Sequence, residues 1–361
     1  MAESDEIVKE RRLQILEMSL GRDVMRYMHD DNVTEVIVNP DGKLWIDTFD
    51  KGFQHTGITI DEDEAKRVIY AVADLSGQVI DLKKDPSLQA DIPASRLFSN
   101  CRFQAELPNI VEAPSFNIRK HSKIVFTLEN YVKQGAMTEK QHEVILDAIH
   151  KKKNIIAAGG TASGKTTLLN AILAEISQLD ERVITIEDTK ELKCTAENKV
   201  ALTTTDTVDM ENLLRKTLRL SPNRIVVGEV RGNEAGAMLQ AMQSGAGALT
   251  TTHSHSAAST MDRLAARGAA GGGLRLDEAY RQIAYNIHLL VHVTLLDDSW
   301  RGGPRRRFIG EIRSLTGAVE GERPVTHLVY RAGRDGEPEV FDPGEELLAE
   351  LAPFADEGVR P

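Results

Sequence analysis

The chain has 361 residues, more than a single hydrophobic core usually serves, so two domains are expected. Its 44 Lys and Arg and 55 Asp and Glu give a formal net charge of -11, which argues against general electrostatic binding of the whole chain to nucleic acid. With only Cys101 and Cys194, neither a disulfide framework nor a cysteine-based zinc site is expected, and a reducing cytoplasm fits best.

The first part of the chain predicts a smaller α+β domain over residues 1–120. Helical and strand patterns alternate along it: helices at 6–29 and 61–79, strands at 33–38 and 43–48, and short apolar runs at 102–119. The two strands flank an Asp-Gly pair, which suits the tight turn of a β-hairpin.

Residues 121–153 are expected to form a linker with one helix, because Thr138 and Gln141 have capping-box spacing. From residue 154 the pattern changes to short apolar runs separated by helical segments. These runs indicate buried strands at 154–158, 182–186, 224–230, 248–253 and 289–295. Apolar strands alternating with helices are typical of an α/β domain whose mainly parallel sheet is covered on both faces. We expect this domain over residues 154–333 and an acidic, mobile tail over 334–361.

Residues 159–166, GGTASGKT, match the P-loop pattern that binds phosphates. Its glycines let backbone N–H groups point at a phosphate, and a helix beginning near Lys165 would present its positive end to the same anion. Lys165 would reach the β- and γ-phosphates of ATP, and the Thr166 hydroxyl would ligate Mg²⁺. The nucleotide-binding residues expected on this basis are Gly159, Gly160, Thr161, Ala162, Ser163, Gly164, Lys165, Thr166 and Thr167.

Two further strands end on acidic residues, at the edge where open α/β sheets bind ligands. One strand leads into Glu187 and Asp188, and the next carries Glu229. Gly228 stands where many P-loop enzymes have the Walker B aspartate. Glu229 is thus left to orient or deprotonate the attacking water, or to hold Mg²⁺ through water. Whether Glu187 or Glu229 is the main catalytic base stays open.

A third strand runs into His253 and His255, one of which could sense the γ-phosphate. On an extended chain the two imidazoles point to opposite faces and no third ligand is evident, so a metal site is not expected there. Downstream, Arg301 and residues 305–307 form a basic turn that we interpret as a solvated hairpin loop, with a partner-binding patch as the alternative.

The motifs GGTASGKTT, ITIEDTKEL, SPNRIVVGEVRGNEA and GALTTTHSHSA occur in this order and resemble the Walker A, Asp box, Walker B and His box of the secretion ATPase superfamily. Upstream, VTEVIVNPDGKLWID and APSFNIRKH are similar to the N-terminal domain of the type IV secretion and conjugative-transfer branch, so the resemblance covers approximately residues 30–330. Within that branch the chain most resembles the conjugal transfer traffic ATPases of the Trb type.

The resemblance implies a RecA-like P-loop ATPase domain that binds ATP and Mg²⁺. It also implies that Glu187 and Glu229 serve catalysis and that His253 is the His-box histidine. Arg119 would reach toward the phosphates from the N-terminal domain, with Arg102 as a second candidate.

By the same resemblance the protein would be a homohexameric ATPase that powers substrate translocation or pilus assembly in a type IV secretion or bacterial conjugation system. It would lie in the cytoplasm, at the cytoplasmic face of the inner membrane, in contact with inner-membrane components of the channel. The sequence has neither a signal-peptide core nor a membrane-spanning apolar run, so this association would be peripheral. The net acidity and the lack of an evident nucleic-acid-binding module disfavour a DNA helicase and sequence-specific nucleic-acid binding.

Two positions depart from the family pattern. Members commonly read Thr-Gly-Ser-Gly where this chain has Ala162 between Thr161 and Ser163, and a Gly-His pair is usual where Gly245 and Ala246 stand. The first change retains a small residue, so the phosphate cradle is expected to survive. The second bears on contacts between subunits.

Two alternative functions are compatible with these motifs: a type II secretion or type IV pilus motor ATPase, and a nucleotide-dependent assembly switch with low turnover. The type II branch often has a four-cysteine zinc insertion, which two cysteines cannot supply. Turnover that rises with protein concentration would favour a motor over a switch.

Overall fold

The computed structural model describes residues 2–96, 99–121, 125–271, 274–333 and 336–342, which divide into two compact units. The first unit contains residues 1–124 and 296–305, and the second contains 125–295 and 306–361. Most of the expected linker therefore groups with the second unit, and the short segment 296–305 groups with the first. The expectation of a mobile tail from residue 334 is wrong for Pro338–Phe341, which form a strand paired with the strand before it, because backbone hydrogen bonds fix this segment at the edge of the sheet. Residues 334–335 and 343–361 of the expected acidic tail lie outside the described residues.

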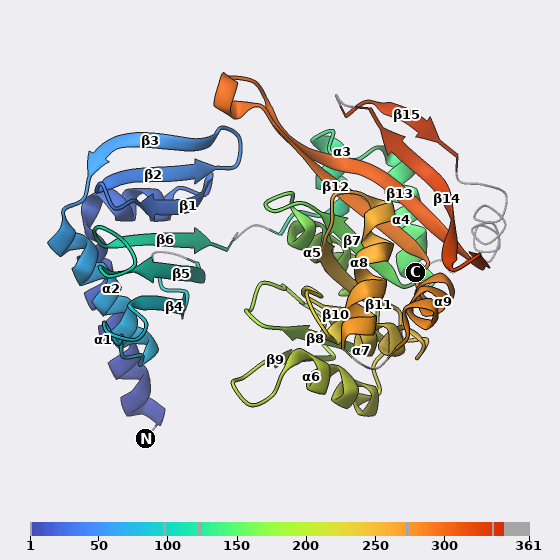
Figure 1. The fold of residues 1–361 in the computed structure, drawn as a ribbon, viewed down its shortest axis with the longest axis horizontal. Coiled ribbons are helices and arrows are strands. Elements are labelled where there is room, and N and C mark those ends of the chain that lie inside the picture. The colour runs from blue at the N-terminus through green and yellow to red at the C-terminus, as the bar shows by residue number, and fades with distance from the viewer. Residues whose placement is uncertain (1, 97–98, 122–124, 272–273, 334–335, 343–361) are drawn as a thin grey trace. The chain divides into compact units, whose positions relative to one another are not determined.

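The first unit is a six-stranded antiparallel sheet with two helices, in strand order β3-β2-β1-β6-β5-β4 (Figure 1). Its elements are α1 (Ala2–His29), β1 (Val33–Val38), β2 (Lys43–Thr48), β3 (Gly52–Thr59), α2 (Glu62–Ser76), β4 (Ser87–Ile92), β5 (Cys101–Glu106), β6 (Ser115–Lys120) and the 3₁₀ turn η2 (Ser299–Arg301). Leu16 of α1, Ile69 of α2 and Phe103 of β5 share one buried core. The helices and the sheet are therefore joined by hydrophobic packing.

The expected hairpin between β1 and β2 forms, and its turn depends on glycine. Gly42 has φ 75°, and its N–H donates to the Asn39 carbonyl at 2.9 Å. A Cβ at this position would lie 2.7 Å from the Ile60 carbonyl oxygen. A larger residue would therefore be strained here both by its backbone angle and by the lack of space.

The second unit contains a nine-stranded sheet in the order β15-β14-β13-β12-β7-β11-β10-β8-β9. From β12 to β9 along this order the strands pair in parallel, whereas β13, β14 and β15 pair with one another antiparallel. The strands are β7 (Ile155–Gly159), β8 (Val183–Glu187), β9 (Lys199–Thr203), β10 (Arg224–Val227), β11 (Ala248–His253), β12 (Leu289–Asp297), β13 (Arg305–Glu320), β14 (Arg323–Ala332) and β15 (Pro338–Phe341). The helices are α3 (Leu128–Lys133), α4 (Glu139–His150), α5 (Lys165–Ile176), α6 (Met210–Thr217), the 3₁₀ turn η1 (Leu218–Leu220), α7 (Glu234–Met242), α8 (Ala257–Ala270) and α9 (Leu276–Asn286).

Helices cover both faces of the parallel part of this sheet. Ile155 and Ala157 of β7 pack in a core with α3, α4 and α5, whereas Ile156 between them packs in a second core with α6, α7, α8 and α9. Successive side chains of a strand point to opposite faces, so a strand buried on both faces must be apolar at nearly every position. The expected parallel sheet with two covered faces is confirmed, as is the capping box of Thr138 and Gln141 at the start of α4.

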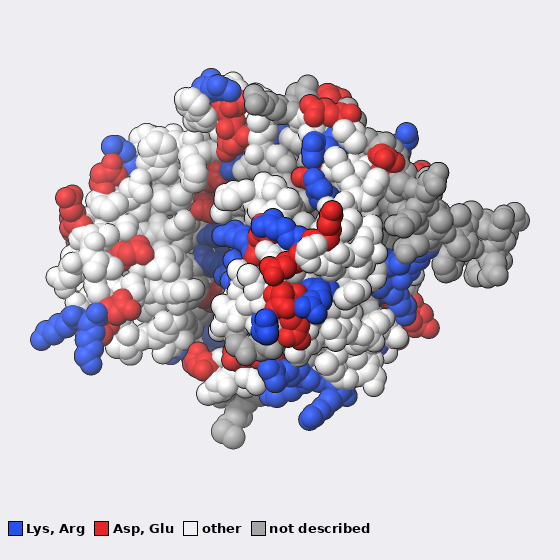
Figure 2. Space-filling model, turned by 45° about the vertical axis from the view of Figure 1, so that its right-hand side comes forward, with Lys and Arg blue, Asp and Glu red and all other residues white. Residues whose placement is uncertain are grey.

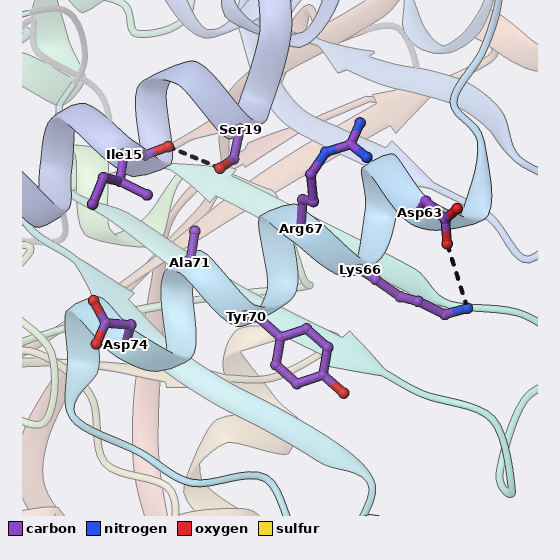
Figure 3. Close-up of a pocket in the computed structure, with 8 residues that line it drawn as sticks. All are labelled: Ile15, Ser19, Asp63, Lys66, Arg67, Tyr70, Ala71 and Asp74. Carbon is purple, nitrogen blue, oxygen red and sulfur yellow. Dashed lines mark hydrogen bonds and ion pairs between the residues drawn. The ribbon is translucent and has the colours of Figure 1, made fainter.

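The surface of the described residues carries mixed charges and includes a shallow groove. On the face in Figure 2, Lys and Arg are interspersed with Asp and Glu. The groove lies in the first unit between α1 and α2 and contains none of the expected site residues (Figure 3); it is lined by Ile15, Ser19, Asp63, Lys66, Arg67, Tyr70, Ala71 and Asp74. None of the described helices combines the length and apolar character that a bilayer-spanning segment needs.

Candidate nucleotide-binding and catalytic site

The P-loop runs from the end of β7 directly into α5, and its backbone requires small residues. A Cβ on Gly159 would lie 2.5 Å from both the Ser163 Oγ and the Val293 carbonyl oxygen. Gly164 has φ 98°, and Ala162 has φ 58°, so two residues of the loop adopt positive φ. Glycine takes these angles at no steric cost, whereas Ala162 adopts them against the preference of an L-residue.

The loop has the properties of an anion site. Gly164 supplies no side-chain cap to the first N–H groups of α5, so these donors are available to an anion at the positive end of the helix. Ser163 Oγ is buried and has no hydrogen-bond partner among the described residues. Lys165 Nζ donates to the Gly160 carbonyl at 2.8 Å, which holds the ammonium group over the loop. These residues therefore fit a bound phosphate chain.

A line of charged and polar side chains leads away from the P-loop lysine. Lys165 Nζ lies 3.2 Å from His253 Nδ1, and His253 Nε2 lies 3.1 Å from a carboxylate oxygen of Glu229. The other oxygen of Glu229 accepts a hydrogen bond from Arg231 Nε at 2.8 Å. The structure thus brings together three of the residues that the sequence singled out, Lys165, His253 and Glu229, and adds Arg231 to them.

The electrostatics of this line favour a neutral imidazole between two charged groups. Partial burial and the nearby Lys165 ammonium lower the pKa of His253, and they outweigh the opposing effect of the Glu229 carboxylate. A neutral His253 has one N–H donor and one acceptor nitrogen. It can therefore accept from Lys165 through Nδ1, while its Nε2 lies 3.1 Å from a Glu229 carboxylate oxygen that forms no hydrogen bond among the described residues.

Glu187 occupies a different position, on the strand next to β10. Its side chain is buried, and one carboxylate oxygen accepts from the N–H groups of Glu191 and Leu192 at 2.8 and 2.7 Å. Burial raises the pKa of Glu187, against the opposing effect of these two hydrogen bonds. Gly228 lies beside it: a Cβ at that position would make an ordinary van der Waals contact with Glu187 Cγ, at 3.4 Å. Glu187 therefore holds the loop that follows β8.

Backbone contacts join the segments that carry these side chains. The Ser254 N–H donates to the Gly159 carbonyl at 3.1 Å, and Thr251 Oγ1 donates to the Gly228 carbonyl at 2.8 Å. Arg267 on α8 adds hydrogen bonds to the Val230 carbonyl and to Thr252 Oγ1. The P-loop, the Glu229 segment and the His253 segment are thus fixed against one another at the carboxyl edge of the sheet.

Sequence reasoning assigned no role to Arg231 or Arg267, and its interpretation of Arg307 as part of a solvated loop is wrong, because Arg307 lies on β13 and donates to the Ala162 carbonyl of the P-loop. Arg231 follows Glu229 by two residues and could have been found from that spacing, because side chains at i and i+2 on an extended segment share a side. Arg267 and Arg307 have no such signal, since their contacts at the site come from helix α8 and strand β13, far along the chain.

The two arginines expected to act from the N-terminal domain lie in the first unit, on adjacent strands. Arg102 of β5 and Arg119 of β6 are cross-strand partners. The Arg119 side chain is about half exposed, and its Nε lies 3.9 Å from a carboxylate oxygen of Glu35 on β1. A role of Arg119 or Arg102 at the phosphates stays a prediction.

The interpretation of residues 305–307 as part of a solvated loop is wrong for Arg305. Its side chain is 3% exposed and forms ion pairs with Asp47 at 2.6 Å and Asp297 at 3.0 Å. These contacts lie within the first unit. A buried arginine needs carboxylate partners, and sequence patterns do not reveal partners more than 200 positions away.

Comparisons with known proteins agree on one family. The model of the type II/IV secretion system protein family matches residues 23–296. The probable conjugal transfer protein TrbB of Sinorhizobium fredii is 41% identical over 257 residues, 70% of this chain and 77% of that protein. The type IV secretion system protein VirB11 of Bartonella henselae is 27% identical over 77% of this chain and 89% of its own. The X-ray structure of the Legionella pneumophila ATPase DotB shares the fold, with a TM-score of 0.58 at 19% identity over 90% of this chain and 81% of that one.

The matched segment contains the P-loop, both candidate acids, His253 and the strands β5 and β6 of the first unit. The family match thus covers the residues that form the site, and the chain belongs to the type II/IV secretion system protein family, among the traffic ATPases of type IV secretion and conjugation.

Proposed function

We propose that this protein is a RecA-like ATPase that hydrolyses ATP to ADP and phosphate and uses the energy for conformational work in a conjugation or type IV secretion system. The observation that carries the proposal is the line from Lys165 through His253 to Glu229, with contacts of 3.2 and 3.1 Å. It connects the lysine that would bind the γ-phosphate with a carboxylate that could act on water. The 41% identity to a conjugal transfer protein supports the choice of system.

In this proposal the P-loop binds the triphosphate. The N–H groups at the start of α5, which receive no side-chain cap, and the buried Ser163 hydroxyl face the phosphates, and Lys165 moves its hydrogen bond from the Gly160 carbonyl to phosphate oxygens. Thr166, one residue into α5, would hold Mg²⁺, which neutralises phosphate charge when bound. Thr167 completes the set expected from the motif.

Glu229 is the proposed general base. Its carboxylate is 18% exposed, within reach of water, and Arg231 and His253 orient it from two sides. His253 is placed to transmit the presence of the γ-phosphate, since Lys165 contacts it now and would turn toward a phosphate instead. Glu187 would contribute by fixing the loop after β8 rather than by accepting the proton.

The assembly is the part of the proposal that rests on family resemblance. We infer a homohexameric ring in the cytoplasm, bound peripherally at the inner membrane to the channel components of the secretion machine. Arg119, helped by Arg102, would couple the N-terminal domain to the nucleotide, so that loss of the γ-phosphate releases a charge-assisted contact.

One observation favours a second candidate, the nucleotide-dependent assembly switch. Glu229 already forms an ion pair with Arg231 at 2.7 Å and contacts His253. A carboxylate whose oxygens are occupied by these two side chains cannot contact an attacking water through them until the partners move. If they move only in an assembled machine, the isolated protein would bind ATP with little turnover.

The decisive experiment is phosphate release by the full chain and by Lys165→Ala, at several protein concentrations, with the assembly mass measured by light scattering. Lys165→Ala should lose more than about nine-tenths of turnover, because a methyl group cannot stabilise the charge at the β- and γ-phosphates. Lys216→Ala, an exposed lysine on α6, is the matched control and should behave as wild type. Retention of more than about a tenth of turnover by Lys165→Ala would refute the assignment. Wild-type turnover that stays negligible at all concentrations would favour the switch.

A further inference from the structure

The P-loop of this chain contains an alanine at a position where its backbone conformation is costly for any residue but glycine. Ala162 adopts φ 58°, in the left-handed region. An L-residue with a Cβ populates this region far less readily than glycine does. A loop with alanine at this position therefore spends less time in the phosphate-binding conformation, unless another contact holds it there.

Such a contact is present. Arg307 Nε donates a hydrogen bond to the Ala162 carbonyl oxygen at 2.9 Å. Its side chain also passes along the end of the loop, with Cδ 3.7 Å from the position that a Cβ of Gly164 would take. A charged donor forms a stronger hydrogen bond than a neutral one. Arg307 thus braces the two positive-φ residues of the loop, Ala162 and Gly164.

The strand that carries Arg307 is fixed where the arginine leaves it. Two residues on, the Ile309 N–H donates to the Ala136 carbonyl at 2.9 Å, and the Ile309 carbonyl accepts from the buried Gln141 side chain at 3.2 Å. Phe308 and Ile309 are themselves buried. The guanidinium therefore extends from an anchored backbone, which is what a positioning contact requires.

We propose that Arg307 is a positioning residue for the P-loop, which compensates for alanine at position 162 by holding its carbonyl in the left-handed, phosphate-binding conformation. The proposal deepens the proposed function and rests on nucleotide binding at this loop. It predicts a specific dependence: the loop needs Arg307 when residue 162 is alanine and needs it much less when residue 162 is glycine.

The test is a double-mutant cycle of Arg307→Ala and Ala162→Gly in the full chain. In the wild-type background, Arg307→Ala should weaken binding of a fluorescent ATP analogue and raise KM about tenfold, the scale of one charge-assisted hydrogen bond, with kcat at saturating ATP changed less. In the Ala162→Gly background the same substitution should cost no more than about twofold, because glycine reaches the conformation unaided. Arg307→Gln, which keeps a donor on a shorter side chain, should lie between wild type and Arg307→Ala. Arg306→Ala, at the exposed neighbouring position on β13, is the matched control.

A second measurement separates this inference from the proposed function. Hydrogen exchange of the peptide that covers residues 160–164 is followed without nucleotide. Exchange of this peptide should be faster in Arg307→Ala than in wild type. In the double variant its rate should be close to that of the single Ala162→Gly variant. Equal losses in both backgrounds, or no loss in either, would overturn the role of Arg307. A wild-type protein that binds no nucleotide, with the exchange pattern as expected, would instead count against the proposed function and leave the positioning contact in place.

Discussion

A comparison of the variants Glu229→Gln and Glu187→Gln tests which of the two carboxylates is the general base, because the structure gives them different surroundings. Glu229 lies beside Arg231 and His253 with an 18% exposed side chain. Glu187 is buried and has one oxygen committed to two backbone N–H groups. A glutamine at either position keeps the shape and an oxygen acceptor, but it cannot accept a proton.

The magnitudes follow from these contacts. Loss of a general base costs about 10²- to 10⁴-fold in kcat, or roughly 2.7–5.4 kcal/mol in the activation free energy. At position 187 the amide oxygen can still accept from Glu191 and Leu192, so Glu187→Gln loses only charge assistance, about 1 kcal/mol or less than tenfold. Burial raises the pKa of Glu187, so the charged form of this side chain is already disfavoured and its removal should cost still less activity.

The assay is steady-state phosphate release, with the binding of a fluorescent ATP analogue measured on the same samples. Both variants should bind the analogue as wild type does, since neither carboxylate is placed in the phosphate cradle. Only Glu229→Gln should lose turnover by 10²-fold or more. If Glu187→Gln loses turnover as far as Glu229→Gln does, or if Glu229→Gln keeps more than a tenth of it, the base is not Glu229.

Two variants of the second unit, Glu181→Ala and Lys152→Ala, and one of the first unit, Arg119→Ala, provide further tests. Arg224 is fully buried and forms an ion pair with Glu181, so Glu181→Ala leaves a buried charge without its carboxylate and should lower the unfolding free energy by about 3–5 kcal/mol. Lys152 has a partly exposed ammonium group 2.9 Å from Glu181, so Lys152→Ala should lower the unfolding free energy by no more than about 1 kcal/mol. Burial alone would raise the pKa of Glu181, but hydrogen bonds from Arg224 and Lys152 outweigh it and lower that pKa; the stabilisation is therefore full above the ordinary glutamate pKa and is lost as pH falls through the lowered value. Denaturant unfolding followed by far-UV circular dichroism at pH 7 and pH 3 checks both statements, and a Glu181→Ala effect that is equal at the two pH values would contradict them. Arg119→Ala should fold normally, because the 3.9 Å ion pair between Arg119 and Glu35 contributes at most about 1 kcal/mol. The variant should nevertheless lose any protection from hydrogen exchange that a non-hydrolysable ATP analogue gives to the first unit. Identical protection in wild type and variant would show that Arg119 has no part in the mechanism.

The sequence by itself predicted many of the elements and most of the site. Alternating and helical periodicities depend only on which side of an element is buried, so β1, β2, α4 and the parallel strands β7, β8, β10, β11 and β12 were predictable within a few residues, whereas the parallel strand β9 was not singled out. The P-loop was equally clear, because the backbone geometry of a phosphate cradle restricts which residues can form it. The order of the motifs placed Lys165, Glu229 and His253 at one edge of the sheet, where the structure brings them within 3.2 Å of one another in turn.

Only the tertiary structure decided which residues far apart in the sequence become partners. Arg307 meets the loop at Ala162, and Arg305 meets Asp47, across 145 and 258 positions of the chain. Pairings over such separations depend on how strands and helices assemble, and local patterns carry no record of them. The surroundings of Glu187 likewise come only from the tertiary structure: its burial and its two backbone hydrogen bonds support the proposal that it holds the loop beside the site, and its role in catalysis stays a prediction.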